Sequence, residues 1–161
     1  MKEINESIGQ KILRYWHRVN RLPAGQWIFA KIVARTVPYS GSIRSKILEL
    51  KPGYTKILLK DRRPVRNHVN SIHAIALANL GELSSGMALL TGLPANVRGI
   101  VININIEYLK KARGNLIAEG WAQVPVVKED IVVQVHSEIR DQQGDMVSRV
   151  VVDWKLGVIK N

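Results

Sequence analysis

One carboxylate stands alone in a long uncharged stretch of this sequence. Glu82 is the only Asp, Glu, Lys or Arg between Arg66 and Arg98, whereas charged residues recur every few positions elsewhere. A carboxylate in apolar surroundings either finds a polar partner and is structural, or is kept in a dry pocket with a raised pKa. The second arrangement is typical of a nucleophile or general base. We therefore take Glu82 as the first candidate for chemistry.

The stretch from Asn67 to Pro94 predicts the element that carries this carboxylate. Its apolar residues occupy every side of a helical projection: Ile75, Leu77, Ala78, Leu80, Leu83, Met87 and Leu90. A helix that is apolar nearly all round is buried inside a protein. We predict a central helix of about 18–20 residues, with Glu82 halfway along. Polar residues and glycines interrupt the run, so no membrane span is predicted.

Composition excludes several classes of protein. The chain has 161 residues, 46% of them apolar and 23% charged, which predicts one globular domain over residues 1–161. The absence of cysteine excludes disulfides, thiolate-bound zinc and a cysteine nucleophile. Charged residues near the N-terminus argue against a signal peptide, so we expect a cytoplasmic protein.

The net charge of +11 implies an anionic partner. The candidates are nucleic acid, a phosphate-bearing cofactor, an acidic carrier protein or an anionic membrane surface. Nucleic-acid binders concentrate their charge and add aromatic residues for stacking, but here the basic residues are spread along the chain. No nucleic-acid partner is therefore expected. Part of the charge can equally serve solubility alone.

Two amphipathic helices are predicted before the central stretch, at residues 3–20 and 23–36. In the second, Trp27, Ile28, Ile32 and Val33 are assigned to the apolar side. Such helices usually cover a face of their own domain, and the alternative is that they lie on a membrane or on another protein.

Six segments show the alternation of β-strands, namely 43–50, 54–60, 100–108, 116–124, 131–139 and 147–156. In 100–108, the residues Ile100, Ile102, Ile104, Ile106 and Tyr108 are predicted to form one apolar face. The alternation favours an antiparallel sheet with one covered face. The predicted fold class is α+β: a curved antiparallel sheet of about six strands wrapped round one long helix, with two extra N-terminal helices.

This layout resembles the hotdog fold, and more specifically the hotdog thioesterases of the phenylacetyl-CoA type. Asn67, His73 and Glu82 match the spacing of that family's Asn, His and acidic residue, whereas Asn70 and Ala74–Ile75 replace its glycines. The chain is also similar to a hotdog subfamily of unknown function, through Pro-Tyr-x-Gly-Ser at 38–42, Arg-Asn-His at 66–68 and Leu-Gly-Glu at 80–82. The resemblance divides the chain into a helical extension, 1–37, and a hotdog core, 38–161.

The resemblance implies hydrolysis of an acyl-CoA or acyl-carrier thioester without a cofactor. Glu82 would act as nucleophile or general base, the amide of Ala74 as oxyanion donor, and Asn67 would orient water or the thioester. His73 joins the catalytic candidates, although a helix-entry residue that hydrogen-bonds to backbone is the competing interpretation. For substrate binding, the candidates are Asn70, Ser85, Lys110, Lys111 and Arg113. Ser85 is alternatively a small packing residue.

Helix geometry adds a constraint on this site. Eight residues separate Ala74 from Glu82, which places them about 12 Å apart along one helix. Catalytic groups must come within about 3 Å of the reacting atoms. The site must therefore combine Ala74 and Asn67 of one subunit with Glu82 of another, in a homodimer or a dimer of dimers.

Other functions fit the same residues less well. A non-catalytic acyl-CoA or fatty-acyl binding protein results if the substituted glycines close the path of attack. A hotdog dehydratase or hydratase would use His and Glu. No spacing of His or Cys supports a metal site, and no Gly-x-Ser-x-Gly motif supports a serine hydrolase.

Overall fold

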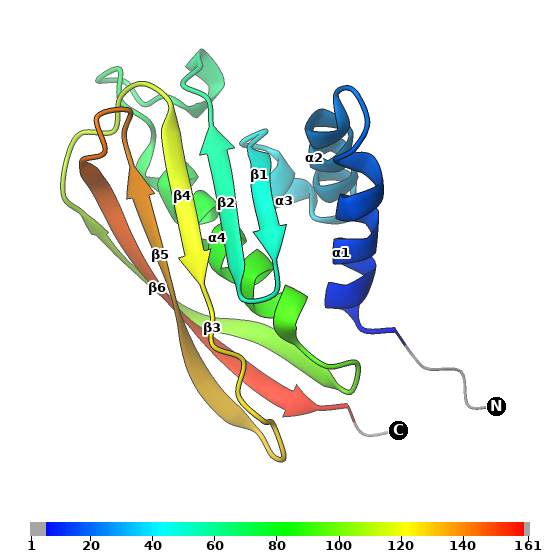
Figure 1. Ribbon diagram of the computed structural model, residues 1–161. Helices are drawn as coiled ribbons and strands as arrows, with labels where there is room; N and C mark the ends of the chain where they lie inside the picture. The colour runs from blue at the N-terminus through cyan, green and yellow to red at the C-terminus, as the bar shows by residue number, and fades with distance from the viewer. Residues whose placement is uncertain (1–5, 160–161) are drawn as a thin grey trace.

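The computed structural model describes residues 6–159. Along the chain (Figure 1), its elements are α1 (Ile8–Val19), α2 (Gly25–Thr36), α3 (Pro38–Gly41), β1 (Lys46–Lys51), β2 (Tyr54–Leu59), the 3₁₀ turn η1 (Arg63–Val65), α4 (Ala74–Gly92), β3 (Val97–Tyr108), β4 (Leu116–Trp121), β5 (Ile131–Arg140) and β6 (Met146–Val158). The strands form one antiparallel sheet in the order β1-β2-β4-β5-β6-β3. The predicted α+β class, with six strands and one long helix, is confirmed.

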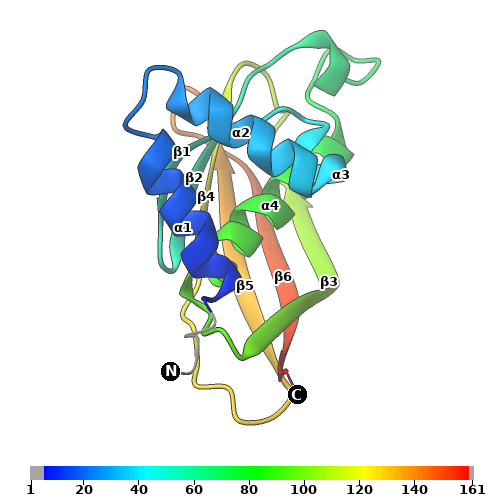
Figure 2. The ribbon, with the colours of Figure 1, turned by 90° about the vertical axis from the view of Figure 1, so that its right-hand side faces the viewer.

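Helix α4 lies across the concave face of the sheet, and α1 to α3 form a further layer beyond it (Figure 2). Helix α4 has 19 residues, within the predicted range of about 18–20. Its core-facing side chains, among them Leu80 and Leu89, are fully buried. By length and composition α4 would suffice to cross a membrane, but 72% of the relevant window is buried inside the protein. It is thus the core helix of this fold.

The helix is held especially close to β4. A Cβ added to Gly120 would lie only 2.5 Å from the carbonyl oxygen of Ser84, so only glycine allows this approach. Above β6, Gly81 lies directly over the side chain of Val150. These contacts fix the height of α4 above the sheet close to Glu82.

Helix α1 covers part of the side of α4 that the sheet leaves open. It starts at a capping box formed by Ser7 and Gln10, and Gly9 packs against the backbone of α4 at Leu90. The rings of Trp16 and Phe29 meet edge-to-face, 5.1 Å apart, and join α1 to α2. The first part of the predicted helix 3–20 lies outside the described residues.

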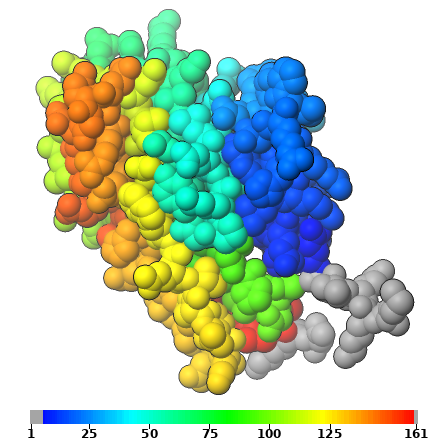
Figure 3. Space-filling model, in the orientation of Figure 1, coloured from blue at the N-terminus to red at the C-terminus, as the bar shows by residue number. Residues whose placement is uncertain are grey.

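The prediction for the apolar side of α2 is wrong. Helix α2 begins at Gly25 rather than Pro23, and its buried aromatic residue is Phe29. Trp27 and Ile32 are 56% and 37% exposed. They point outward because α1, α3 and β1 take up the opposite side of the helix. In the space-filling view, α1 and α2 (blue) form a layer beside β1 and β2 (cyan; Figure 3).

The prediction of one apolar face along β3 is also wrong. Val101 pairs with Trp154 and Asn103 with Asp153, so Ile102 is an extra residue in a bulge. The bulge turns Ile104 to the face of the sheet opposite that of Ile100. Because β3 is an edge strand, Ile100, Ile102 and Ile104 stay 61%, 52% and 40% exposed.

Candidate active site

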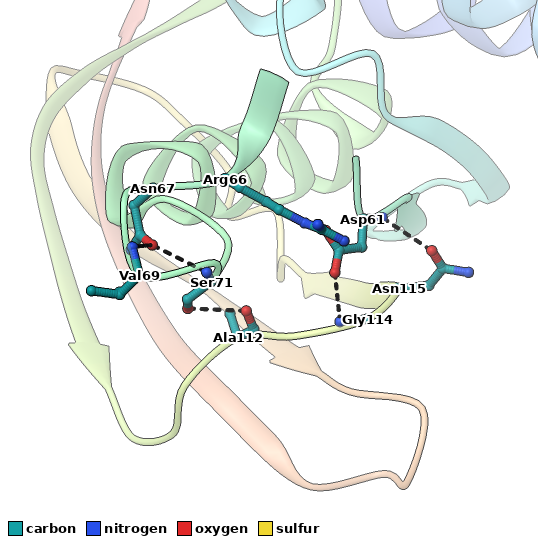
Figure 4. Close-up of polar contacts among 8 residues, drawn as sticks. All are labelled: Asp61, Arg66, Asn67, Val69, Ser71, Ala112, Gly114 and Asn115. Atoms are coloured by element: carbon teal, nitrogen blue, oxygen red, sulfur yellow. Dashed lines mark hydrogen bonds and ion pairs between the residues drawn. The ribbon is translucent and has the colours of Figure 1, made fainter. Parts of the chain in front are cut away.

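The loop that leads into α4 is fixed by one carboxylate. Asp61 accepts a hydrogen bond from Arg66 at 2.6 Å and another from the amide of Gly114 at 2.9 Å, and its own amide donates to Asn115 (Figure 4). The hydrogen bond from Arg66 holds the pKa of Asp61 below its usual value. This network ties the loop to the segment between β3 and β4.

Asn67 shapes the same loop from within. Its Oδ1 accepts hydrogen bonds from the amides of Val69 and Ser71, each at 3.1 Å, and the hydroxyl of Ser71 donates to the carbonyl of Ala112 (Figure 4). The carbonyl oxygen of the Asn67 side chain is therefore engaged by the protein itself. Its side-chain nitrogen remains as the group that can meet a ligand.

Asn70 has a left-handed backbone conformation, with φ of +54°. Asparagine and glycine adopt this conformation more readily than other residues. Asn70 can therefore adopt the left-handed conformation at the position where the resembling thioesterases have glycine. Asn70 is exposed and lies outside the pocket described next.

His73 caps the start of α4. Its Nδ1 accepts a hydrogen bond from the amide of Ile75 at 3.1 Å, and the side chain is otherwise exposed. This geometry supports the interpretation of His73 as a helix-entry residue. Within the described chain, the amide of Ala74 has no hydrogen-bond acceptor, so it points a free donor outward from the positive end of the helix.

A pocket of about 340 Å³ opens at this helix start. It brings four of the sequence-predicted residues together, namely Asn67, Ala74, Lys110 and Lys111. Tyr108 lines it too and donates a hydrogen bond to the carbonyl of Ala74 at 3.1 Å. The pocket thus combines a free backbone donor, an amide side chain and basic residues, a set that suits an acyl oxygen and nearby anionic groups.

The basic residues at this pocket differ in what they can offer. Lys110 forms ion pairs of 2.6 Å with both Asp141 and Asp145, so its charge is compensated within the chain. Lys111 and Arg113 are without an ion pair in the described residues, although Arg113 lies beyond the pocket lining. These two are the cations available to a phosphate.

Glu82 lies two turns further along α4, outside that pocket. It is half-buried, and burial raises the pKa of its carboxyl group, while a hydrogen bond from Ser40 partly opposes the shift. Glu82 shares a stripe of α4 with Ala74 and Ala78, at a spacing of four residues, and this stripe is not fully covered.

The floor beside Glu82 is aromatic. Gly86 lies one turn on, and a Cβ placed there would meet the ring of Trp154 at 3.1 Å and Oε1 of Glu82 at 3.9 Å. The indole Nε1 of Trp154 is buried and finds no acceptor among the described residues. The carboxylate therefore lies beside a close contact between the backbone of Gly86 and the indole ring of Trp154.

Sequence reasoning missed the two residues that support Glu82 from α3. Ser40 lies near the carboxyl group of Glu82 and lowers its pKa, and Asn79 donates to the carbonyl of Tyr39 at 3.1 Å, which fixes α3 on α4. The Pro-Tyr-x-Gly-Ser motif at 38–42 was the available signal, and Ser40 is its unspecified position.

Ser85 does not line an open groove. It is fully buried, and its hydroxyl donates to the carbonyl of Glu82 at 2.9 Å. It packs where α4 approaches Gly120, and this agrees with its interpretation as a small packing residue.

Comparison with known proteins decides the family. A model of a domain of unknown function, DUF4442, matches residues 25–156. The chain belongs to the DUF4442 family. No curated protein matches the sequence of this DUF4442 chain.

Solved structures share the fold of this DUF4442 chain, which is the hotdog fold. The crystal structure of a genomics target has 28% identity and a TM-score of 0.78, covering 93% of this chain and 97% of that one. A Pseudomonas aeruginosa protein of unknown function, called a probable thioesterase, has 20% identity and a TM-score of 0.73, covering 85% and 97%. A hypothetical thioesterase from Streptococcus pneumoniae, crystallised with coenzyme A, has 16% identity and a TM-score of 0.65, covering 80% and 99%.

The left-handed conformation of Asn70 yields a prediction for stability. Asn70→Ala should lower the free energy of unfolding by about 1 kcal/mol, because alanine is strained at positive φ, whereas Asn70→Gly should change it by a few tenths at most. Urea denaturation measures both variants, with Val69→Ala as a control at the exposed neighbour. Equal stability of the Ala and Gly variants would contradict the assignment.

The contact between Ser40 and Glu82 yields a prediction for titration. Ser40→Ala removes the hydrogen bond that favours the ionised carboxylate, so the pKa of Glu82 should rise further above its usual value. NMR titration of the labelled glutamate carboxyl carbons reports this pKa directly. Ser42→Ala, at an exposed neighbouring position, should leave it in place.

Proposed function

We propose that this chain is a thioesterase that hydrolyses an acyl thioester of coenzyme A or of an acyl carrier. The observation that carries the proposal is a half-buried carboxylate with a raised pKa, Glu82, on the same open stripe of α4 as the free amide of Ala74. Support comes from solved structures of the same fold that are called thioesterases, one of them crystallised with coenzyme A.

In the proposed reaction, the ionised Glu82 removes a proton from a water molecule as that water attacks the thioester carbonyl carbon. The developing oxyanion is stabilised by the amide of Ala74 at the start of the helix. Collapse of the intermediate breaks the C–S bond. The thiolate that leaves takes up the proton held by Glu82, which gives a carboxylic acid and a thiol. Because the base must be ionised, activity should rise with pH through the raised pKa of Glu82.

The two groups come together only if a second chain takes part, since about 12 Å of helix separates them within one chain. Strand β3 offers the means. It is a 12-residue edge strand with exposed Ile100, Ile102 and Ile104, and long apolar edges of this kind are templates for pairing. Antiparallel pairing of two β3 strands about a twofold axis would lay the two α4 helices side by side.

The same arrangement assigns a role to the free cations. In a cytoplasmic homodimer, Lys111 and Arg113 at the mouth of the pocket would meet phosphates of coenzyme A or of a carrier-bound phosphopantetheine. Lys110, compensated by two aspartates, would instead hold the pocket wall in place.

A second candidate function is binding without turnover. Two observations favour it. Oδ1 of Asn67 and Nδ1 of His73 are both engaged in local hydrogen bonds, and an exposed Ile75 stands where the resembling phenylacetyl-CoA-type thioesterases have glycine. An acyl-CoA binding protein would keep the pocket and the cations but show no hydrolysis.

The catalytic role of Glu82 is tested by Glu82→Gln, which keeps the size of the side chain and removes its base. Hydrolysis of a panel of acyl-CoAs, followed as thiol release, should fall about 10²–10⁴-fold in kcat. The matched control is Glu49→Gln, an exposed glutamate on β1, which should retain full activity. Undiminished turnover in Glu82→Gln would exclude the mechanism, and binding without turnover in the wild type would favour the second candidate.

The role of β3 is tested by the pair Ile102→Lys and Ile104→Lys, made together. Charges on this edge should convert the dimer to a monomer in analytical ultracentrifugation and abolish hydrolysis, because the site loses one of its two chains. Val132→Lys places one such charge on an exposed apolar position of β5 and should leave the dimer intact. A wild-type protein that is monomeric yet active would contradict the shared site.

A further inference from the structure

The outer layer of the protein has a surface that the proposed reaction does not use. It consists of Lys11 and Arg18 on α1 and of Trp27, Lys31, Ile32 and Arg35 on α2, and is called here the basic helix face. All six side chains are exposed, and the two helices form an outer layer that packs on α4 and on the edge strand β1 (Figure 2).

The charge of this layer is one-sided. Residues 7–48 contain eight Lys and Arg residues and no Asp or Glu, so this quarter of the chain carries most of the net charge of +11. Apart from Glu3, Glu6 and Glu82, the 13 acidic residues lie in the strands and their connecting loops, and Glu6 forms an ion pair with Arg14 of α1. The field above the basic helix face is therefore strongly positive.

The apolar part of this face points outward at helical spacing. Trp27, Lys31 and Arg35 follow one another at intervals of four residues, with Ile32 beside them, and Nζ of Lys31 lies 3.7 Å from the centre of the Trp27 ring. Single exposed apolar residues are common on any protein surface. An exposed Trp and Ile interleaved with cations on one convex helix is instead the pattern of a helix that lies at a membrane interface.

We propose that the basic helix face binds the surface of an anionic lipid bilayer, with Trp27 and Ile32 inserted at the headgroup level. Lys11, Arg18, Lys31 and Arg35 would contact the lipid phosphates. The proposal is independent of Glu82 and of hydrolysis. Binding there would hold the protein where acyl chains collect. Helix α3, which follows α2 directly, contains Ser40, and the side chain of Ser40 lies near Glu82.

Other occupants fit the face less well. A second copy would bring two strongly positive surfaces together, which repel each other. The anchoring side chains of a protein partner usually enter pockets at the centre of an interface. The cavity below α2, lined by Ala30, Val33 and Leu83, has a volume of only about 10 Å³. A bilayer needs no such cavity.

The test is co-sedimentation of the full chain with phosphatidylcholine vesicles, with and without phosphatidylglycerol. The wild type should bind the anionic vesicles at low salt, bind pure phosphatidylcholine far less, and be released as ionic strength rises. The pair Lys31→Glu and Arg35→Glu should weaken binding at least about 25-fold, at roughly fivefold for each cation removed. Trp27→Ala should bind more weakly and become more sensitive to salt.

The matched control is Lys128→Glu with Lys155→Glu, which changes the net charge equally but at exposed positions far along the chain. It should keep nearly full vesicle binding, and thermal unfolding should show all variants folded. Absence of wild-type binding to anionic vesicles, or an equal loss in the control pair, would overturn the proposal. The proposal would also be overturned if the protein did not bind vesicles but did bind an acidic carrier protein, or itself, in a way that depends on Lys31 and Arg35.

Discussion

The structure depends on the packing of α4 between a curved sheet and a layer of helices. Burying this helix requires that nearly all of its side chains be apolar or small, and its own backbone hydrogen bonds satisfy the rest. In that environment a single carboxylate is costly, so its placement is informative. Glu82 remains because one stripe of the helix stays partly open and because Ser40 reaches it from α3.

The two ends of this stripe have complementary chemistry. The start of α4 offers a pocket, basic residues and the amide of Ala74, which is unpaired within residues 6–159, whereas its middle offers a carboxyl group with a raised pKa. Neither end is sufficient for an acyl-transfer reaction, which needs stabilisation of negative charge and activation of a nucleophile at one carbon atom. The distance between the ends follows from the helix itself, so assembly of chains is the simplest way to unite them.

The sequence predicted those features that depend on periodic patterns. The uncharged stretch predicted α4 to its length, and alternation predicted six strands. It did not predict the bulge at Ile102, because a bulge leaves the alternating pattern of residues unchanged and alters only their pairing. The sequence also did not predict that Trp27 points outward. A helix with apolar residues on two sides does not reveal which side its neighbours will cover. Ser40 was missed because contacts between distant segments leave no local pattern.

The close contact at Gly120 limits how this protein can adapt to the size of a bound group. Backbone meets backbone there, so α4 can neither sink toward β4 nor roll over it without a steric clash. Room for a longer or wider group must therefore come from the flank where α4 meets side chains of β6 such as Val150 and Trp154, or from the helices outside α4. Selectivity for size would then be determined by residues on β6 and α3 rather than by the helix that carries the carboxylate.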